Sequence, residues 1–63
     1  MSAVTDLVTF RQILVDLRRG MVAKAIEPGN PDHAQHAMGV ANAQSWIEAV
    51  DNAIADERKL AAG

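Results

Sequence analysis

The residues best suited to metal chemistry are His33 and His36, which stand three positions apart and close to Asp32. On a helix that spacing places both imidazoles on one side, and zinc accepts imidazole and carboxylate ligands. A closed zinc site needs four ligands, and no further cluster of ligand residues accompanies these three. We therefore predict no metal site, and expect His33 to lie at a helix start and His36 at the edge of a helix contact.

The basic residues Arg11, Arg18, Arg19 and Lys24 occupy one half of the chain and raise the question of nucleic acid binding. A recognition helix needs exposed side chains that read bases, yet residues 33–47 carry no Asp, Glu, Lys or Arg. The net charge of −2 also gives no general attraction to phosphates. We do not expect a nucleic acid partner, and expect these cations to pair with carboxylates instead.

Residues that could support catalysis are scarce. The chain has no cysteine, no tyrosine and no glycine-rich phosphate loop, and Ser2 and Ser45 have no base close by in the sequence. A helical chain of 63 residues also has little volume with which to enclose a substrate. The sequence predicts a protein that is not an enzyme, with no cofactor and no small-molecule substrate.

Membrane insertion and secretion are also not expected. The longest run without charges, 33–47, is shorter than the roughly 20 residues that span a bilayer. Asp6 and Arg11 interrupt any apolar core of a signal peptide. The basic residues form no continuous polar face for binding to a membrane surface. These features favour a location in the cytoplasm or within a particle.

The stretch Glu27–Pro31 should reverse the chain. Pro28 disfavours helix at the residue before it, and Gly29 can adopt a positive φ. Asn30 followed by Pro31 is typical of an N-cap and first helical position. The sequence predicts an all-α, single-domain antiparallel hairpin over residues 1–63, with helices at about 4–26 and 31–60 and a turn at 27–30.

Apolar residues at alternating spacings of three and four predict how the helices pack. Gly20 could end the first helix, but Met21 keeps the apolar spacing in phase, so we favour continuation to Ile26. The second helix should pack through a series that begins at His36. The predicted intrachain core is Leu7, Phe10, Leu14, Leu17, Met21, Val40, Ala43, Trp46, Ile47, Val50 and Ile54.

A second apolar series runs beside the first on the N-terminal helix. It either borders a wide core or is covered by a second chain, because a helix that is apolar on two sides should be buried on two sides. The uncharged run 33–47 also suggests a covered surface. The candidate partner interface is Val4, Val8, Arg11, Val15, Arg18, Val22, Ile26, Ala34, Ala37 and Ala41.

A hairpin of this size has a thin core. Burial at roughly 25 cal/mol per Å2 barely offsets ~1.5 kcal/mol of conformational entropy per ordered residue. Without cysteine the chain cannot form disulfides, so oligomerisation or docking on a larger subunit is the remaining source of stability. We therefore expect a protein partner, either a second copy or a larger subunit.

The chain resembles small helical-hairpin proteins encoded by tailed bacteriophages. The similarity lies in the segment Leu14–Arg18, the Gly/Pro turn and the alanine-rich return helix with Trp46–Val50, and it spans nearly the whole chain. The resemblance implies a capsid, head–tail or tail accessory component of a virion. The alternative hypothesis is a homodimeric four-helix-bundle adaptor or regulator that binds a host protein.

Overall fold

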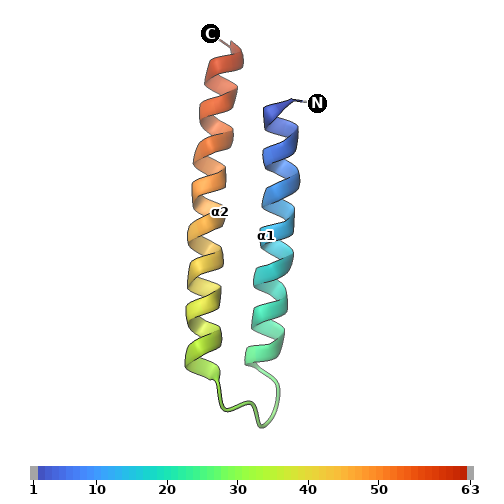
Figure 1. The fold of residues 1–63 in the computed structure, drawn as a ribbon, viewed down its shortest axis with the longest axis vertical. Coiled ribbons are helices and arrows are strands. Elements are labelled where there is room, and N and C mark those ends of the chain that lie inside the picture. Colours follow the sequence, from blue (N-terminus) through green and yellow to red (C-terminus); the bar gives the residue numbers. More distant parts are fainter. Residues whose placement is uncertain (1, 63) are drawn as a thin grey trace.

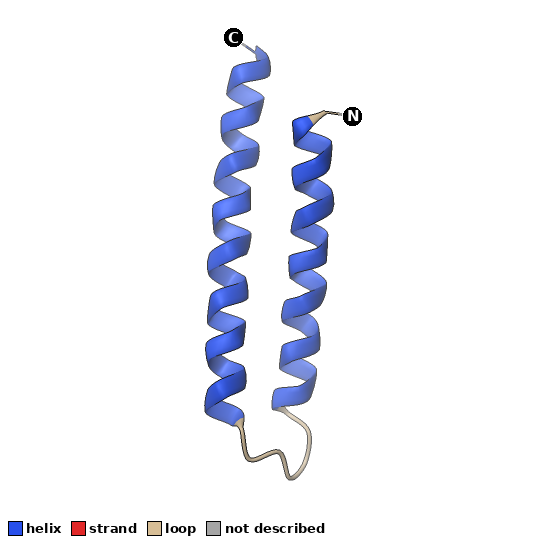
Figure 2. Ribbon diagram, in the orientation of Figure 1, coloured by secondary structure: helices blue, strands red, loops and turns tan. Residues whose placement is uncertain are grey.

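The computed structural model describes residues 2–62, which form two antiparallel α-helices (Figure 1). Helix α1 spans Ala3–Ala25, helix α2 spans His33–Ala62, and the turn at 26–32 joins them. The described part of the chain contains no strand (Figure 2). The predicted all-α helical hairpin is confirmed, with helix bounds that differ from the predicted ones by one or two residues at each end.

Helix α1 begins and ends through local backbone chemistry. The Ser2 hydroxyl accepts a hydrogen bond from the Thr5 N–H at 3.1 Å, which satisfies one of the free donors of the first turn. Asp6 adds a negative charge at the positive end of the helix dipole. The helix passes through Gly20 without a break and ends at Ala25. Of the two alternatives for this helix, continuation beyond Gly20 is confirmed.

The turn is built around Gly29 and Asn30. Gly29 has φ 81°, the left-handed conformation expected of it. The Asn30 side chain donates from Nδ2 to the Lys24 carbonyl and accepts the Asp32 N–H at Oδ1, both at 2.8 Å. We had predicted that Asn30 is the N-cap of α2, and that prediction is wrong. Its side chain instead joins the end of α1 to the end of the turn. The Asp32 carbonyl receives the first helical hydrogen bond, from the His36 N–H.

Helix α2 packs through the series predicted for it. Ile47 is the most deeply buried large side chain, with 2% of its surface exposed, and Val40 is half-buried. The turn is longer than the predicted four residues, so each residue of α1 lies opposite a later residue of α2 than a four-residue turn would give. Arg11, for example, lies opposite Asp51. The buried members of the α2 series are Ala43, Ile47, Val50 and Ile54.

Helix α1 faces α2 with a different side than the predicted one. Leu14 is buried as expected, but Val15 is buried as well, with only 6% of its surface exposed. Val15 was predicted to lie on a partner interface, and that prediction is wrong. The predictions that Phe10, Leu17 and Trp46 are core residues are also wrong, because all three are exposed. The residues of α1 that are buried or half-buried are Val4, Leu7, Arg11, Leu14, Val15, Arg18, Met21 and Ala25.

Near the turn the two helices meet through Met21 and Gly39. A Cβ atom on Gly39 would lie 3.0 Å from the Met21 Sδ, so the missing side chain leaves space for the thioether. Gly20 has no such neighbour, because nothing lies within 4 Å of a Cβ placed there. At this level of the hairpin a methionine of α1 therefore packs over a single glycine of α2.

The hairpin is a single layer of two helices. Its principal extents are 52, 17 and 10 Å, and its radius of gyration is 14.9 Å, against about 11 Å for a globular domain of this length. The accessible surface is 4624 Å2, whereas a typical globular protein of 6.7 kDa exposes roughly 3900 Å2. Each helix is thus buried along one side and leaves a second side uncovered.

Candidate interaction surface

The hairpin has two broad faces, one on either side of the contact between the helices. One is crossed by polar side chains that connect α1 to α2, and we call it the bridged face; it comprises Val8, Arg11, Arg18, Val22, Gln44, Glu48 and Asp51. The other carries large apolar side chains, and we call it the aromatic face; it comprises Phe10, Ile13, Leu17 and Trp46. Both faces lie over the same core.

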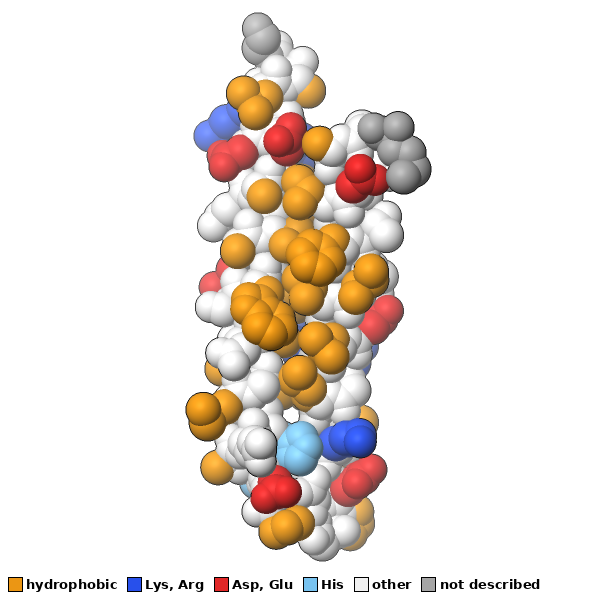
Figure 3. All heavy atoms as spheres, viewed as in Figure 1, with side chains coloured by type: hydrophobic (Ala, Val, Ile, Leu, Met, Phe, Trp, Pro, Cys, Tyr) orange, Lys and Arg blue, Asp and Glu red, His pale blue; other side chains and the backbone are white. Residues whose placement is uncertain are grey.

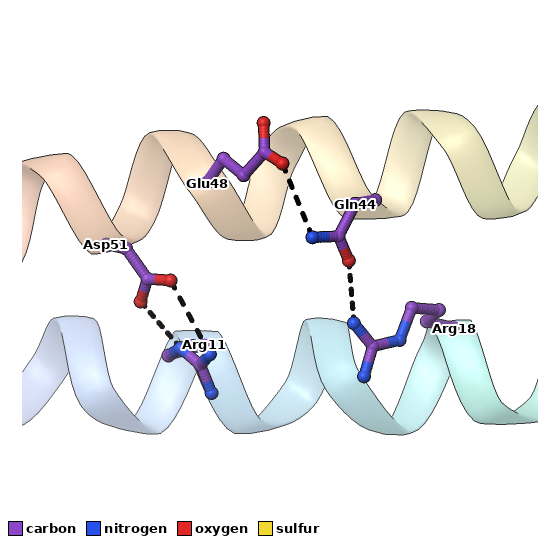
Figure 4. Close-up of polar contacts among 5 residues, drawn as sticks. All are labelled: Arg11, Arg18, Gln44, Glu48 and Asp51. Carbon is purple, nitrogen blue, oxygen red and sulfur yellow. Dashed lines mark hydrogen bonds and ion pairs between the residues drawn. The ribbon is translucent and has the colours of Figure 1, made fainter.

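On the bridged face, Arg11 and Asp51 form an ion pair between the helices. The Arg11 Nε lies 2.6 Å from Oδ1 of Asp51, and its Nη2 lies 3.5 Å from Oδ2 (Figure 4). The hydrogen bond to this carboxylate and its charge raise the pKa of Arg11 above the ordinary value for arginine. Arg11 is therefore protonated at physiological pH and joins the two helices at this level.

About two helical turns closer to the loop, a second polar contact crosses the same face. The Arg18 Nη1 donates to Oε1 of Gln44 at 2.7 Å, and Gln44 Nε2 donates to Oε1 of Glu48 at 3.4 Å (Figure 4). The amide of Gln44 thereby joins a cation on one helix to a carboxylate on the other.

The two arginines explain why α1 packs with an unexpected side. Arg11 and Arg18 are half-buried, so their aliphatic stems cover the core while their guanidinium groups reach polar partners at its edge. We had predicted that they lie on a partner interface, but both find acceptors on α2 of the same chain. With the arginines in this position Val15 faces the core, and Phe10 and Leu17 face solvent.

The other candidate interface residues behave differently from Val15. Val4 is half-buried and packs against the core cluster, so it contributes mainly to the hairpin itself. The remaining apolar candidates, on both helices and in the turn, are exposed. They are Val8, Val22, Ile26, Ala34, Ala37 and Ala41.

The aromatic face holds both aromatic side chains of the chain, together with Ile13 and Leu17. The exposed fractions are 49% for Phe10, 58% for Ile13 and 48% for Trp46, with Leu17 similar. Phe10, Ile13 and Leu17 recur at helical spacing on α1, and the Arg18–Gln44 contact places Trp46 beside them on α2. Figure 3 shows hydrophobic side chains from both helices forming a continuous patch along the line where the helices meet.

An open groove extends this face toward the turn. It has a volume of about 460 Å3 and is lined by Leu17, Gly20, Met21 and His36, with Lys24 and Asp16 at its edges. Gly20 has no side chain in the groove, and the Met21 side chain packs against Gly39 of α2. The groove is therefore a shallow continuation of the apolar patch that a side chain from a packed helix could enter.

The two histidines are engaged by backbone carbonyls. His33 Nδ1 lies 2.7 Å from the Ala25 carbonyl, and His36 Nδ1 lies 2.8 Å from the Asp32 carbonyl. Because a carbonyl oxygen only accepts, Nδ1 is the protonated nitrogen in each ring. His33 thus joins the start of α2 to the last turn of α1, a role that the sequence pattern did not reveal. Among the residues that the structure describes, no group of three or more His, Cys, Asp or Glu could hold a metal ion.

Neither helix in the described part of the chain contains a stretch that is both long and apolar enough to cross a bilayer. No protein-family model, curated protein or solved structure matches this chain.

Proposed function

We propose that this chain is a non-enzymatic interaction protein that contributes a two-helix layer to a larger protein assembly. The observation that supports it most directly is the aromatic face, where Phe10, Ile13, Leu17 and Trp46 leave about half of their surfaces in water. Side chains of this size normally complete a core. Here the core has only one helix pair to form it.

The composition of the aromatic face is that of a protein interface. Aromatic residues are enriched in such interfaces, and a few large side chains near the centre usually account for most of the binding energy. Burial of apolar surface contributes roughly 25 cal/mol per Å2, so covering Phe10 and Trp46 would add to the marginal stability of a lone hairpin. Burial of this face is thus favourable for association and for folding alike.

We further propose that the assembly is a bacteriophage virion, in which the chain is a capsid, head–tail or tail accessory component. This finer proposal is supported by the resemblance of the segments Leu14–Arg18 and Trp46–Val50, with their intervening turn, to small phage-encoded helical hairpins. A rigid rod 52 Å long is also a suitable shape for insertion between larger subunits.

Fractionation of the native source by size tests the proposal. The chain should co-sediment with large particles, and Trp46→Gln should release it to the top of the gradient while Val8→Gln, on the bridged face, leaves it bound. A chain that sediments only as a free species of one or two copies contradicts the assembly role and supports the adaptor or regulator instead.

A further inference from the structure

We propose that the partner of the aromatic face is a second copy of this chain, packed antiparallel to the first so that the two hairpins form a four-helix bundle. This inference rests on the proposed role as an interaction protein and names the first partner of the same surface. The turn end of each hairpin would lie beside the open end of the other.

The surface area favours a second copy. A globular dimer of twice 6.7 kDa would expose roughly 6500 Å2, about 30% less than two separate hairpins of 4624 Å2 each. A face 52 Å long and 17 Å wide has room for the ~800 Å2 per partner of a standard interface. One additional two-helix layer therefore suffices to give the chain an ordinary ratio of surface to mass.

The arrangement of side chains also suits two-fold symmetry, in which one patch contacts itself. Ile13 lies near the middle of the aromatic face, between Phe10 on the open side and Leu17 with Trp46 on the turn side. An antiparallel two-fold axis near Ile13 places Phe10 of one copy against Leu17 and Trp46 of the other. Large side chains then meet on both sides of the axis, which is the packing of a bundle core.

One pair of opposite charges, Lys24 and Asp6, suits the antiparallel orientation. Asp6 lies one turn before Phe10, and Glu57 lies about three turns after Trp46. Arg58 and Lys59 follow Glu57, so the open end carries charges of both signs. At the turn end the groove is lined by Lys24, His36 and Asp16, and the Asp32 carbonyl bonds to His36. A parallel pair would bring the two copies of Asp6 to the same end, whereas the antiparallel pair places Lys24 near Asp6 of the second copy. Figure 3 shows acidic and basic side chains near both ends of the hairpin.

Molecular mass in solution tests the pairing. Sedimentation equilibrium should give twice the chain mass, and the emission of the single tryptophan, Trp46, should shift to the blue as the concentration rises through the dissociation constant. Ile13→Asp, which is exposed in the single hairpin, should raise that constant by roughly 100-fold, because it buries two carboxylates near the axis. Val8→Asp is the matched control on the bridged face and should leave it unchanged. Helical content from circular dichroism confirms that each variant folds at high concentration.

Disulfide trapping tests the orientation, because the native chain has no cysteine. A mixture of Lys24→Cys and Asp6→Cys chains should form the mixed disulfide in preference to either self-disulfide. Preferential self-disulfides would overturn the antiparallel arrangement, and so would a wild-type chain that stays folded and monomeric at high concentration.

The two proposals fail separately. A monomeric chain that still co-sediments with particles contradicts the homodimer and retains the assembly role. A stable dimer that never enters particles supports the homodimer and contradicts the assembly role. Loss of dimer in Val8→Asp but not in Ile13→Asp would assign the contact to the bridged face and overturn the inference.

Discussion

The bridged face and the aromatic face expose apolar side chains to similar degrees, with Val8 47% and Phe10 49% exposed, yet their surroundings differ. Arg11 and Arg18 connect the helices across the bridged face through Asp51 and Gln44. Among the described residues, no ion pair joins α1 to α2 on the aromatic face. The difference teaches that exposure of apolar side chains alone does not identify a binding surface. On the bridged face, the polar side chains already have partners within the hairpin.

The largest expected effect comes from the core beneath both faces. Ile47→Ala should lower the free energy of unfolding by about 2–5 kcal/mol, because it removes a fully buried side chain and leaves a cavity. Ile13→Ala removes the same atoms from the aromatic face and should change the stability of the single hairpin far less. Urea unfolding of both variants at low concentration makes the comparison, and equal losses would show that Ile13 is part of the intrachain core.

The next effect separates the two faces by association. Trp46→Ala should weaken association by at least about 2 kcal/mol, the range of interface residues that dominate binding. Val8→Ala, with nearly the same exposed fraction, should weaken it by less than a few tenths of a kcal/mol. Concentration-dependent sedimentation measures both. Similar losses for the two variants would remove the distinction between the faces.

Two glycine variants should alter stability through the conformation of the backbone. Gly20→Ala should raise the free energy of unfolding by up to about 1 kcal/mol, since it lies inside α1 with open space around it. Gly29→Ala should lower it by about 1 kcal/mol, since its φ is positive. Thermal melts followed by circular dichroism should show opposite shifts. Stabilisation by Gly29→Ala would show that the turn adopts another conformation.

The smallest effect is expected from the ion pair of the bridged face. Arg11→Gln should lower the melting temperature slightly at low salt and less at 1 M salt, where the screening length falls to about 3 Å. Because the pKa of Arg11 is raised in the folded chain, its contribution is fully present below the pKa of an unfolded arginine and is lost only as the pH rises through the higher folded value. The stability difference between the two chains should therefore stay constant across neutral pH. A difference that grew with salt would show that solvation, not attraction, sets its sign.

The sequence predicts the buried side of α2 well, except for Trp46, because the other core residues of that helix form a single apolar series. Ala43, Ile47, Val50 and Ile54 recur in one phase, and every one of them is buried. The hairpin and the positive φ of Gly29 follow from turn chemistry that acts over a few residues. Features decided by local propensity and one unbroken period are therefore accessible from sequence.

The orientation of α1 was not accessible in the same way. Two apolar series overlap on this helix, and hydrophobicity gives no reason to prefer Phe10 over Val15 as a core residue. The choice depends on partners for Arg11 and Arg18 across the helix pair, and thus on the register. Register in turn depends on the turn length, which Asn30 extends by bonding both to α1 and to Asp32. A search for acidic or amide residues opposite the arginines would have found Asp51 and Gln44 only after that length was known.

The hydrogen bonds from Asn30 and His33 to the end of α1 have a consequence for the order in which the hairpin forms. Their bonds to Lys24 and Ala25 join residues only six and eight positions apart, whereas Arg18–Gln44 spans 26 positions and Arg11–Asp51 spans 40. Each contact shortens the loop that the next contact has to close. The additional conformational entropy lost at each step is therefore small. We expect the helices to zip from the turn outward, on the microsecond-to-millisecond timescale of chains dominated by local contacts. The register is then fixed at the turn before Phe10 and Trp46 come to lie on the same surface.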